Sequence, residues 1–188
     1  MDMDTLLDFM ALVEKLKCST RHSWTSDGRR ESVAEHSFRL CVFAWLVKDQ
    51  IPDVDADRLI RLCLFHDLGE AVTGDIPAFE KDDEDRRTER EAWDMITKRL
   101  PVPYSTELSG ILQELEENQT KEAQLAHALD KMEALIQHNE ASIDTWLPLE
   151  YELQRVYGNE ECEAFAFTRE LRGRIRQDSE EKILRESR

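Results

Sequence analysis

The fold and the chemistry of this chain are decided by the stretch Leu59-Ile60-Arg61-Leu62-Cys63-Leu64-Phe65-His66-Asp67-Leu68-Gly69-Glu70. An apolar run ends there at a histidine that is followed directly by an aspartate. Adjacent side chains on a helix point apart, but at a helix end both can turn toward one point. Glu70 lies four residues after His66 and three after Asp67, so helical spacing would place it on a face with both. The stretch therefore predicts a metal-binding corner where a helix ends.

Two further candidate ligands are distant from this corner in the sequence. They are His36, in Ser32-Val33-Ala34-Glu35-His36-Ser37, and Asp130, in Ala128-Leu129-Asp130-Lys131-Met132. With the corner they supply two imidazoles and two carboxylates, a set suited to a hard or borderline divalent cation. A carboxylate among apolar residues is costly unless it is paired or bound to a cation, although Lys131 or an arginine could also satisfy Asp130. The residues alone leave both interpretations open.

Helical periodicity recurs along the chain, whereas glycine (6) and proline (5) are sparse and no segment shows a clean period-two alternation. Ser32, with Glu35 three residues later, is a capping box that opens a helix. Residues 18–31 are expected to form a loop and residues 73–77 a turn. The pattern predicts an all-α fold, a single domain over residues 1–188 with a core at about 4–140 and additional C-terminal helices at about 147–187. The expected helices cover about residues 4–17, 32–50, 55–66, 82–100, 104–117, 121–140, 147–157 and 160–187.

The composition limits the classes of partner. The 41 acidic and 25 basic residues give a formal charge of −16, which repels the phosphates of a nucleic acid. A small phosphate substrate is compatible with this charge, because a bound metal and one or two arginines can invert the local field. No apolar stretch approaches the roughly 20 residues that cross a bilayer, and the acidic N-terminus is unlike a secretory signal. We therefore expect a cytoplasmic protein without a nucleic-acid or membrane partner.

The four candidate ligands, in this order on an all-α chain, resemble the signature of the HD-domain phosphohydrolases. Two stretches, Glu31-Ser32-Val33-Ala34-Glu35-His36 and His66-Asp67-Leu68-Gly69-Glu70-Ala71-Val72-Thr73-Gly74-Asp75-Ile76-Pro77, resemble the branch of the small bacterial 5′-deoxynucleotidases and their eukaryotic relatives. The similarity covers about residues 5–140. It implies a single HD domain, a helical bundle with a buried divalent-metal site.

The resemblance also implies roles for individual residues. The metal, which would be Co, Mn, Zn, Fe, Ni or Mg, would be held by His36, His66, Asp67 and Asp130. It would polarise the phosphoryl oxygen and lower the pKa of a bound water. Asp67 and Glu70 would form the catalytic pair, and Glu70 would carry the proton traffic. Alternatively, Glu70 only orients a ligand or pairs with an arginine.

Three substrate-binding residues follow from the same resemblance. Arg21 would grip the phosphate, which suits a guanidinium because it matches two phosphate oxygens at once. Trp24 would restrict the sugar, and Asp75 would lie beside the sugar hydroxyl. Trp24 could instead be a core anchor, and Asp75 could cap its own turn. Some relatives have the tryptophan directly after the arginine, where this chain has His22, and others have the Arg-x-x-Trp spacing seen here.

The sequence thus predicts a metal-dependent phosphomonoesterase that hydrolyses (deoxy)nucleoside 5′-monophosphates to nucleoside and phosphate by direct attack of water. The alternative on the same fold is a phosphodiesterase or an alarmone hydrolase. A non-catalytic nucleotide-binding protein is a third hypothesis, although no ligand or acid is missing. Because relatives are often dimers, a homodimer is a further expectation, and the helices beyond residue 140 could cover a partner or their own core.

Overall fold

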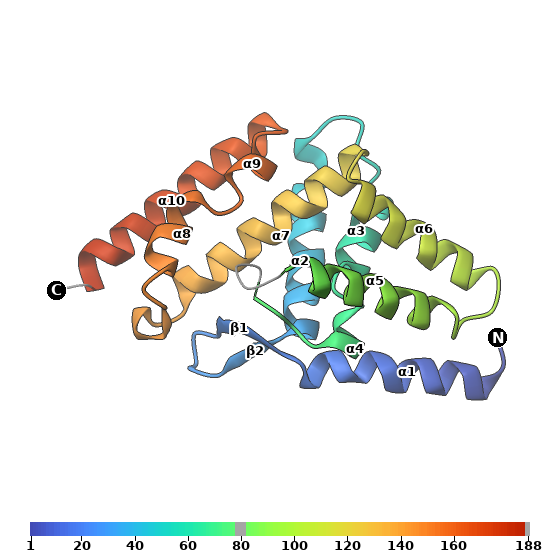
Figure 1. Ribbon diagram of the computed structural model, residues 1–188. Helices are drawn as coiled ribbons and strands as arrows, with labels where there is room; N and C mark the ends of the chain where they lie inside the picture. The colour runs from blue at the N-terminus through green and yellow to red at the C-terminus, as the bar shows by residue number, and fades with distance from the viewer. Residues whose placement is uncertain (78–81, 187–188) are drawn as a thin grey trace.

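Helices make up most of the computed structural model of this protein, which describes residues 1–77 and 82–186 (Figure 1). The predicted all-α fold class is confirmed. The α-helices are α1 (Met3–Cys18), α2 (Val33–Val47), α3 (Ala56–Phe65), α4 (Glu70–Thr73), α5 (Asp83–Thr97), α6 (Tyr104–Glu117), α7 (Lys121–Glu140), α8 (Glu150–Val156), α9 (Asn159–Cys162) and α10 (Ala166–Glu186), and the 3-10 helices are η1 (Lys48–Gln50) and η2 (Ile143–Thr145).

The prediction of a loop over residues 18–31 was wrong for half of that segment. It forms an antiparallel hairpin of β1 (Thr20–Trp24) and β2 (Arg30–Ser32). Gly28 lies in the connection with a φ of 86°, a conformation that glycine adopts without steric cost. The dipeptide Asp27-Gly28 is a hairpin signal, but the strands are too short to show an alternating pattern.

Two helix boundaries also differ from the expectation. The helix expected over residues 160–187 is divided into α9 and α10, and residue 187 lies outside the described residues. The helix with the His-Asp corner, α3, ends at Phe65, so Glu70 does not continue the helical face of His66 and Asp67. Instead, the chain turns, with the Glu70 amide donating to the Asp67 carbonyl at 3.0 Å, and α4 begins. As expected, the corner lies where a helix ends.

The predicted capping box of α2 is present in full. The Glu35 amide donates to Ser32 Oγ at 3.3 Å, and the Ser32 amide donates to Glu35 Oε2 at 2.9 Å. Hydrogen bonds from Arg29 and from the Ser32 backbone lower the pKa of Glu35 to about 2. The charged cap fixes where α2 begins, and therefore where His36, one turn later, enters the interior.

The central helix of the fold is α7. It packs against α2 and α3 and also against α9 and α10, and Figure 1 shows it running between these two groups. One hydrophobic cluster contains buried residues of α2, α3, α6 and α7 together with Cys162 and Ile175. A second cluster joins α1, α4, α5 and α6. Phe65 packs against both clusters, so the His66-Asp67 corner lies where the two cores meet.

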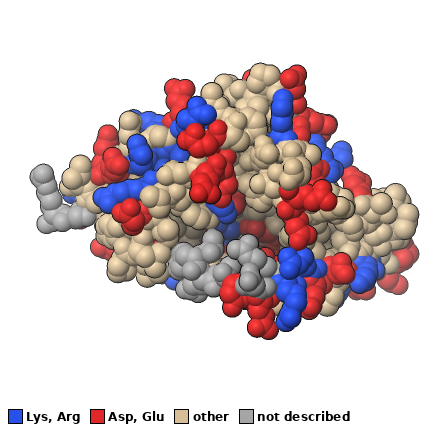
Figure 2. All heavy atoms as spheres, turned by 45° about the horizontal axis from the view of Figure 1, so that its top comes forward, with Lys and Arg blue, Asp and Glu red and all other residues tan. Residues whose placement is uncertain are grey.

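The C-terminal helices share the core of the rest of the chain, since Cys162 and Ile175 belong to the first cluster. The division into a core at residues 4–140 and additional helices stays a prediction. None of the helices in the described part of the chain is long and apolar enough to span a bilayer. On the face drawn in Figure 2, acidic and basic side chains are interspersed, and the surface is hollowed near its middle.

The contact of Gly158 with α7 gives a first prediction. Gly158 has a φ of 72°, and a Cβ there would lie 2.6 Å from Lys131 Cβ. We expect Gly158→Ala to lower the free energy of unfolding by about 2–4 kcal/mol, combining the left-handed backbone penalty with overpacking. Gly28→Ala is the control, because Gly28 has the same sign of φ and nothing within 4 Å of its Cβ position. Urea unfolding of both variants measures the difference, and equal losses would contradict the packing role.

Candidate metal centre and active-site cavity

The four predicted ligands converge at one buried point. His36 comes from α2, His66 and Asp67 follow α3, and Asp130 comes from α7. His36 Nε2 lies 3.2 Å from His66 Nε2 and 3.1 Å from Asp130 Oδ1. His66 Nε2 lies 3.0 Å from Asp67 Oδ2 and 3.7 Å from Asp130 Oδ1. The structure therefore brings together residues that are up to 94 positions apart in the sequence.

The other nitrogen of each imidazole faces an acceptor. His66 Nδ1 lies 2.8 Å from the Cys63 carbonyl oxygen, and His36 Nδ1 lies 2.5 Å from Glu133 Oε2. A carbonyl or a carboxylate only accepts, so each Nδ1 carries a proton and each Nε2 faces the centre, where a neutral ring would offer its lone pair to a metal ion. With both rings in that form, the two Nε2 atoms 3.2 Å apart would repel each other unless a cation lay between them.

Distance and charge both fit a divalent cation at this point. Around a cation with metal–ligand distances of about 2.1 Å, neighbouring ligand atoms are roughly 3.0–3.4 Å apart, close to the separations seen here. Burial and Arg21 lower the pKa of His36, but Asp130 and Glu133 outweigh them and raise it to about 10. The surrounding carboxylates thus favour a positive charge at the centre, and a metal ion supplies it.

Both ligand carboxylates are held in the charged form. Burial raises the pKa of Asp67, but His66 and Arg21 outweigh it and keep that pKa below its ordinary value. Burial acts on Asp130 in the same way, and Lys131 and His36 keep its pKa well below the ordinary value. Lys131 Nζ lies 3.2 Å from Asp130 Oδ2, while Oδ1 faces His36. Lys131 therefore pairs with one oxygen of Asp130, and the other oxygen faces the centre, where it could bind a metal ion.

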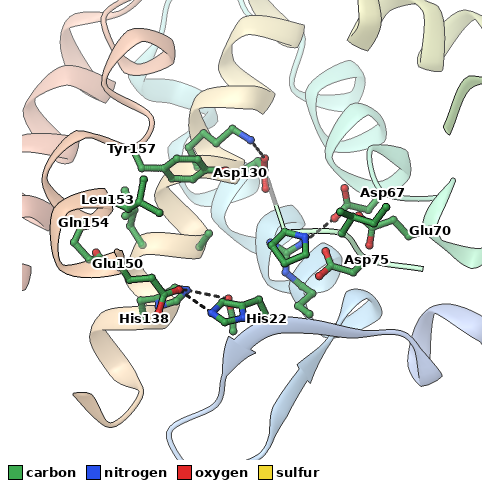
Figure 3. A pocket seen from close by; sticks show the side chains of 17 residues that line it. His22, Asp67, Glu70, Asp75, Asp130, His138, Glu150, Leu153, Gln154 and Tyr157 are labelled. Carbon is green, nitrogen blue, oxygen red and sulfur yellow. Dashed lines mark hydrogen bonds and ion pairs between the residues drawn. The ribbon is translucent and has the colours of Figure 1, made fainter. Parts of the chain in front are cut away.

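A cavity of about 140 Å³ opens beside the centre (Figure 3). Five of the predicted site residues line it, namely Arg21, Asp67, Glu70, Asp75 and Asp130. Of the four predicted ligands, His36 and His66 are not among the described residues that line it. Glu70 is buried at the start of α4, and in Figure 3 it lies on the same side of the cavity as Asp67 and Asp75. The catalytic role of Glu70 stays a prediction.

Arg21 lies at the edge of the centre as predicted. Its Nη1 donates to Asp67 Oδ2 at 3.0 Å, and its Nε lies 3.4 Å from Glu31 Oε2. Burial lowers the pKa of Arg21, but Asp67, Asp130 and Asp75 outweigh it, so the guanidinium is a permanent cation. Its remaining N–H groups are available to an anion in the cavity.

Trp24 is not among the described residues that line the cavity. Its ring is covered by the guanidinium of Arg30, with Cζ 4.5 Å from the ring centroid, and its carbonyl accepts from Gln137 Nε2 at 2.8 Å. The hairpin instead presents His22 and Ser23 to the cavity, and α7 adds His138. The sequence assigned no role to either histidine, because a single histidine carries no positional signal. The sugar-restricting role of Trp24 stays an untested prediction.

Sequence reasoning also missed two buried carboxylates behind the centre, those of Glu31 and Glu133. Glu133 is 1% exposed and holds His36, and Glu31 is 2% exposed and faces Arg21. Burial and Glu133 raise the pKa of Glu31 to about 7. A signal for Glu133 existed, because it lies one helical turn after Asp130 and therefore on the same face of α7. Its partner, however, is 97 residues away.

The carboxylate behind His36 gives a second prediction. Glu133→Ala removes the acceptor that fixes the tautomer of His36, and we expect metal affinity to fall about 10–100-fold. Glu133→Gln keeps an acceptor oxygen and should recover part of that loss. Titration with Co²⁺ measures the affinity. Glu140→Ala is the matched control, because Glu140 is an exposed carboxylate of the same helix that pairs with Arg39. Unchanged affinity in Glu133→Ala would contradict the orienting role.

The sequence is similar to those of known enzymes over most of its length. It is 36% identical over 140 residues to the 5′-deoxynucleotidase HDDC2 of Homo sapiens, covering 72% of this chain and 68% of that protein. It is 30% identical over 141 residues to the 5′-deoxynucleotidase hdd1 of Schizosaccharomyces pombe, covering 71% of this chain and 70% of the other.

A solved structure shares the fold over nearly the whole chain. It is a predicted metal-dependent phosphohydrolase from Magnetospirillum magnetotacticum MS-1, 28% identical, with a TM-score of 0.80 and coverage of 97% of this chain and 96% of that one. The pattern of the HD domain matches residues 13–168, which include all four converging ligands. By sequence, fold and ligand set, the chain belongs to the HD domain family.

Proposed function

We propose that this protein is a metal-dependent phosphomonoesterase that hydrolyses 2′-deoxynucleoside 5′-monophosphates to the nucleoside and phosphate. The observation that carries the proposal is the set of four ligands converging beside a cavity that also contains Arg21 and Glu70. The relatives that are named 5′-deoxynucleotidases support the choice of substrate.

Each of the site residues has a separate role in the proposed reaction. His36, His66, Asp67 and Asp130 hold the cation, which when bound would neutralise charge on the phosphoryl oxygens and lower the pKa of water at the site. Arg21 donates to the phosphate oxygens from the edge of the cavity. Water attacks phosphorus while the ester bond to the 5′ oxygen breaks. Glu70, acting as a carboxylate, accepts the proton of the attacking water and passes it to the leaving 5′ oxygen, which returns Glu70 to the charged form.

An anionic substrate is compatible with a chain of formal charge −16 when a bound metal and the basic residues of the cavity offset the carboxylates that also line it. Arg21 and Lys131 both line it, and the metal adds two further charges. Lys131 Nζ also lies 5.2 Å from the Tyr157 ring centroid, which holds the side chain against the cavity wall. We further propose that the protein has no nucleic-acid partner, as its charge indicates, and that it forms a homodimer, as its resemblance to the family implies.

Phosphate release tests the proposed reaction. The protein, stripped and reloaded with Co²⁺ or Mn²⁺, should release phosphate from deoxynucleoside 5′-monophosphates, and Asp67→Ala should abolish the release because it removes a ligand. Asp57→Ala is the matched control, since Asp57 is an exposed aspartate of α3. No release from any monophosphate with either metal would rule the proposal out, and cleavage of cyclic or pyrophosphorylated nucleotides alone would favour the diesterase alternative.

The guanidinium of Arg21 gives a separate prediction. Arg21→Lys retains the charge but loses the planar guanidinium, which can contact Asp67, Glu31 and a phosphate at the same time. We therefore expect KM to rise about 10–100-fold with a smaller change in kcat. Steady-state kinetics on one deoxynucleotide measures both constants. Arg61→Lys, an exposed position on α3 paired with Glu107, is the control. If Arg21→Lys changed kcat alone, Arg21 would act on the chemical step rather than in binding.

A further inference from the structure

The cavity has a second end, formed by the C-terminal part of the chain. Besides the residues around the metal centre, its lining includes Glu150, Leu153, Gln154 and Tyr157 of the α8 region. Figure 3 shows these side chains on the side of the cavity opposite Asp67, Glu70 and Asp75. The proposed function places the phosphate at the metal end, so the remainder of the substrate must extend toward α8.

Three polar side chains from three elements meet at this second end. His22 Nε2 of β1 lies 2.9 Å from Glu150 Oε1 of α8, and His138 Nε2 of α7 lies 3.5 Å from the same oxygen. The other oxygen of Glu150 accepts from the Leu147 amide at 2.6 Å. Glu150 is 3% exposed, so a buried carboxylate holds both imidazoles in place. We call these three residues the His22–Glu150–His138 cluster.

The protonation of this cluster follows from its contacts. His22 Nε2 lies 2.9 Å from a Glu150 oxygen, which only accepts, so the Nε2 of His22 carries a proton that it donates to Glu150. Burial lowers the pKa of His138, which favours the neutral form of that ring. The two rings stack with centroids 6.1 Å apart. This end of the cavity therefore presents two stacked heteroaromatic rings next to a buried carboxylate.

The chemistry of this end selects the kind of group that it can bind. The bound metal and Arg21 attract the phosphate to the metal end, whereas Glu150 at the α8 end repels it, so the substrate is oriented with its phosphate at the metal end. Leu135 and Leu153 line the cavity beside the polar groups and supply apolar surface. Gln154 Oε1 accepts a hydrogen bond from Ser179 Oγ, so the amide N–H groups of Gln154 are turned away from Ser179. Apolar surface with a few fixed donors and acceptors suits a flat, neutral heteroaromatic ring.

We propose that the His22–Glu150–His138 cluster, together with the apolar side chains beside it, is a subsite for the nucleobase of the substrate and discriminates among nucleobases. The proposal rests on the proposed function for the position of the phosphate. It also assigns a task to the C-terminal helices, which complete the cavity through α8.

A substrate without a base provides the test. The kcat/KM values of the four deoxynucleoside 5′-monophosphates are compared with that of 2-deoxyribose 5-phosphate, for wild type, Glu150→Gln and His138→Ala. In both variants the ratio of deoxynucleotide to 2-deoxyribose 5-phosphate should fall about tenfold, and unequally among the four bases. Because both substrates are measured on the same preparation, the ratio of their kcat/KM values does not depend on the fraction of the protein that is folded. Glu152→Gln, an exposed position on α8, is the control.

Direct binding separates this proposal from the proposed reaction. Isothermal titration with the four free 2′-deoxynucleosides needs no turnover, and both cluster variants should bind them about tenfold more weakly than wild type. If wild type released no phosphate but showed this difference in binding, the reaction would fail and the subsite would stand. Equal losses on 2-deoxyribose 5-phosphate and on deoxynucleotides, unchanged ratios, or absence of nucleoside binding by wild type would each overturn the subsite.

Discussion

The structure depends on one electrostatic constraint, the meeting of two imidazole nitrogens and two carboxylates at a buried point. Such a group is stable only with a positive charge among its members. Each imidazole is turned inward by an acceptor behind it, the Cys63 carbonyl for His66 and Glu133 for His36. Removing the acceptors would leave the ligands present but not oriented. The orientation, more than the ligand set, makes the site suited to a cation.

Helix α7 connects this constraint to the rest of the fold. It supplies the predicted ligand Asp130, the acceptor Glu133 one turn later, and His138 at the far end of the cavity. Its apolar residues belong to the same cluster as those of α2, α3 and α10. The same helix therefore lines the metal end and the α8 end of the cavity, and a shift of α7 would move both together. The proposed phosphate and nucleobase subsites are thus fixed relative to one another by a single rigid element.

Much of the fold was predictable because its signals are local. Helical periodicity placed α1, α2, α3, α6 and α7 close to their observed bounds, and the capping box of Ser32 and Glu35 marked the start of α2. The hairpin was missed because its strands are too short to alternate visibly, although Asp27-Gly28 signalled the turn. The divided C-terminal helix was missed because a short break leaves little trace in the pattern. The convergence of the four ligands was expected from their resemblance to a family signature, not from spacing.

By itself, the sequence determined the helical class of the protein and the position of the His66-Asp67 corner at the end of an apolar helix, and through its resemblance to a family signature it predicted a set of four metal ligands. Periodicity, caps and motifs are properties of neighbouring residues, so the chain carries them locally. Only the tertiary structure decided that Glu133 holds His36, that Trp24 lies under Arg30, and that Glu150 meets His22 and His138. The partner of a buried polar group is set by packing between residues far apart in sequence, and no local pattern encodes that proximity.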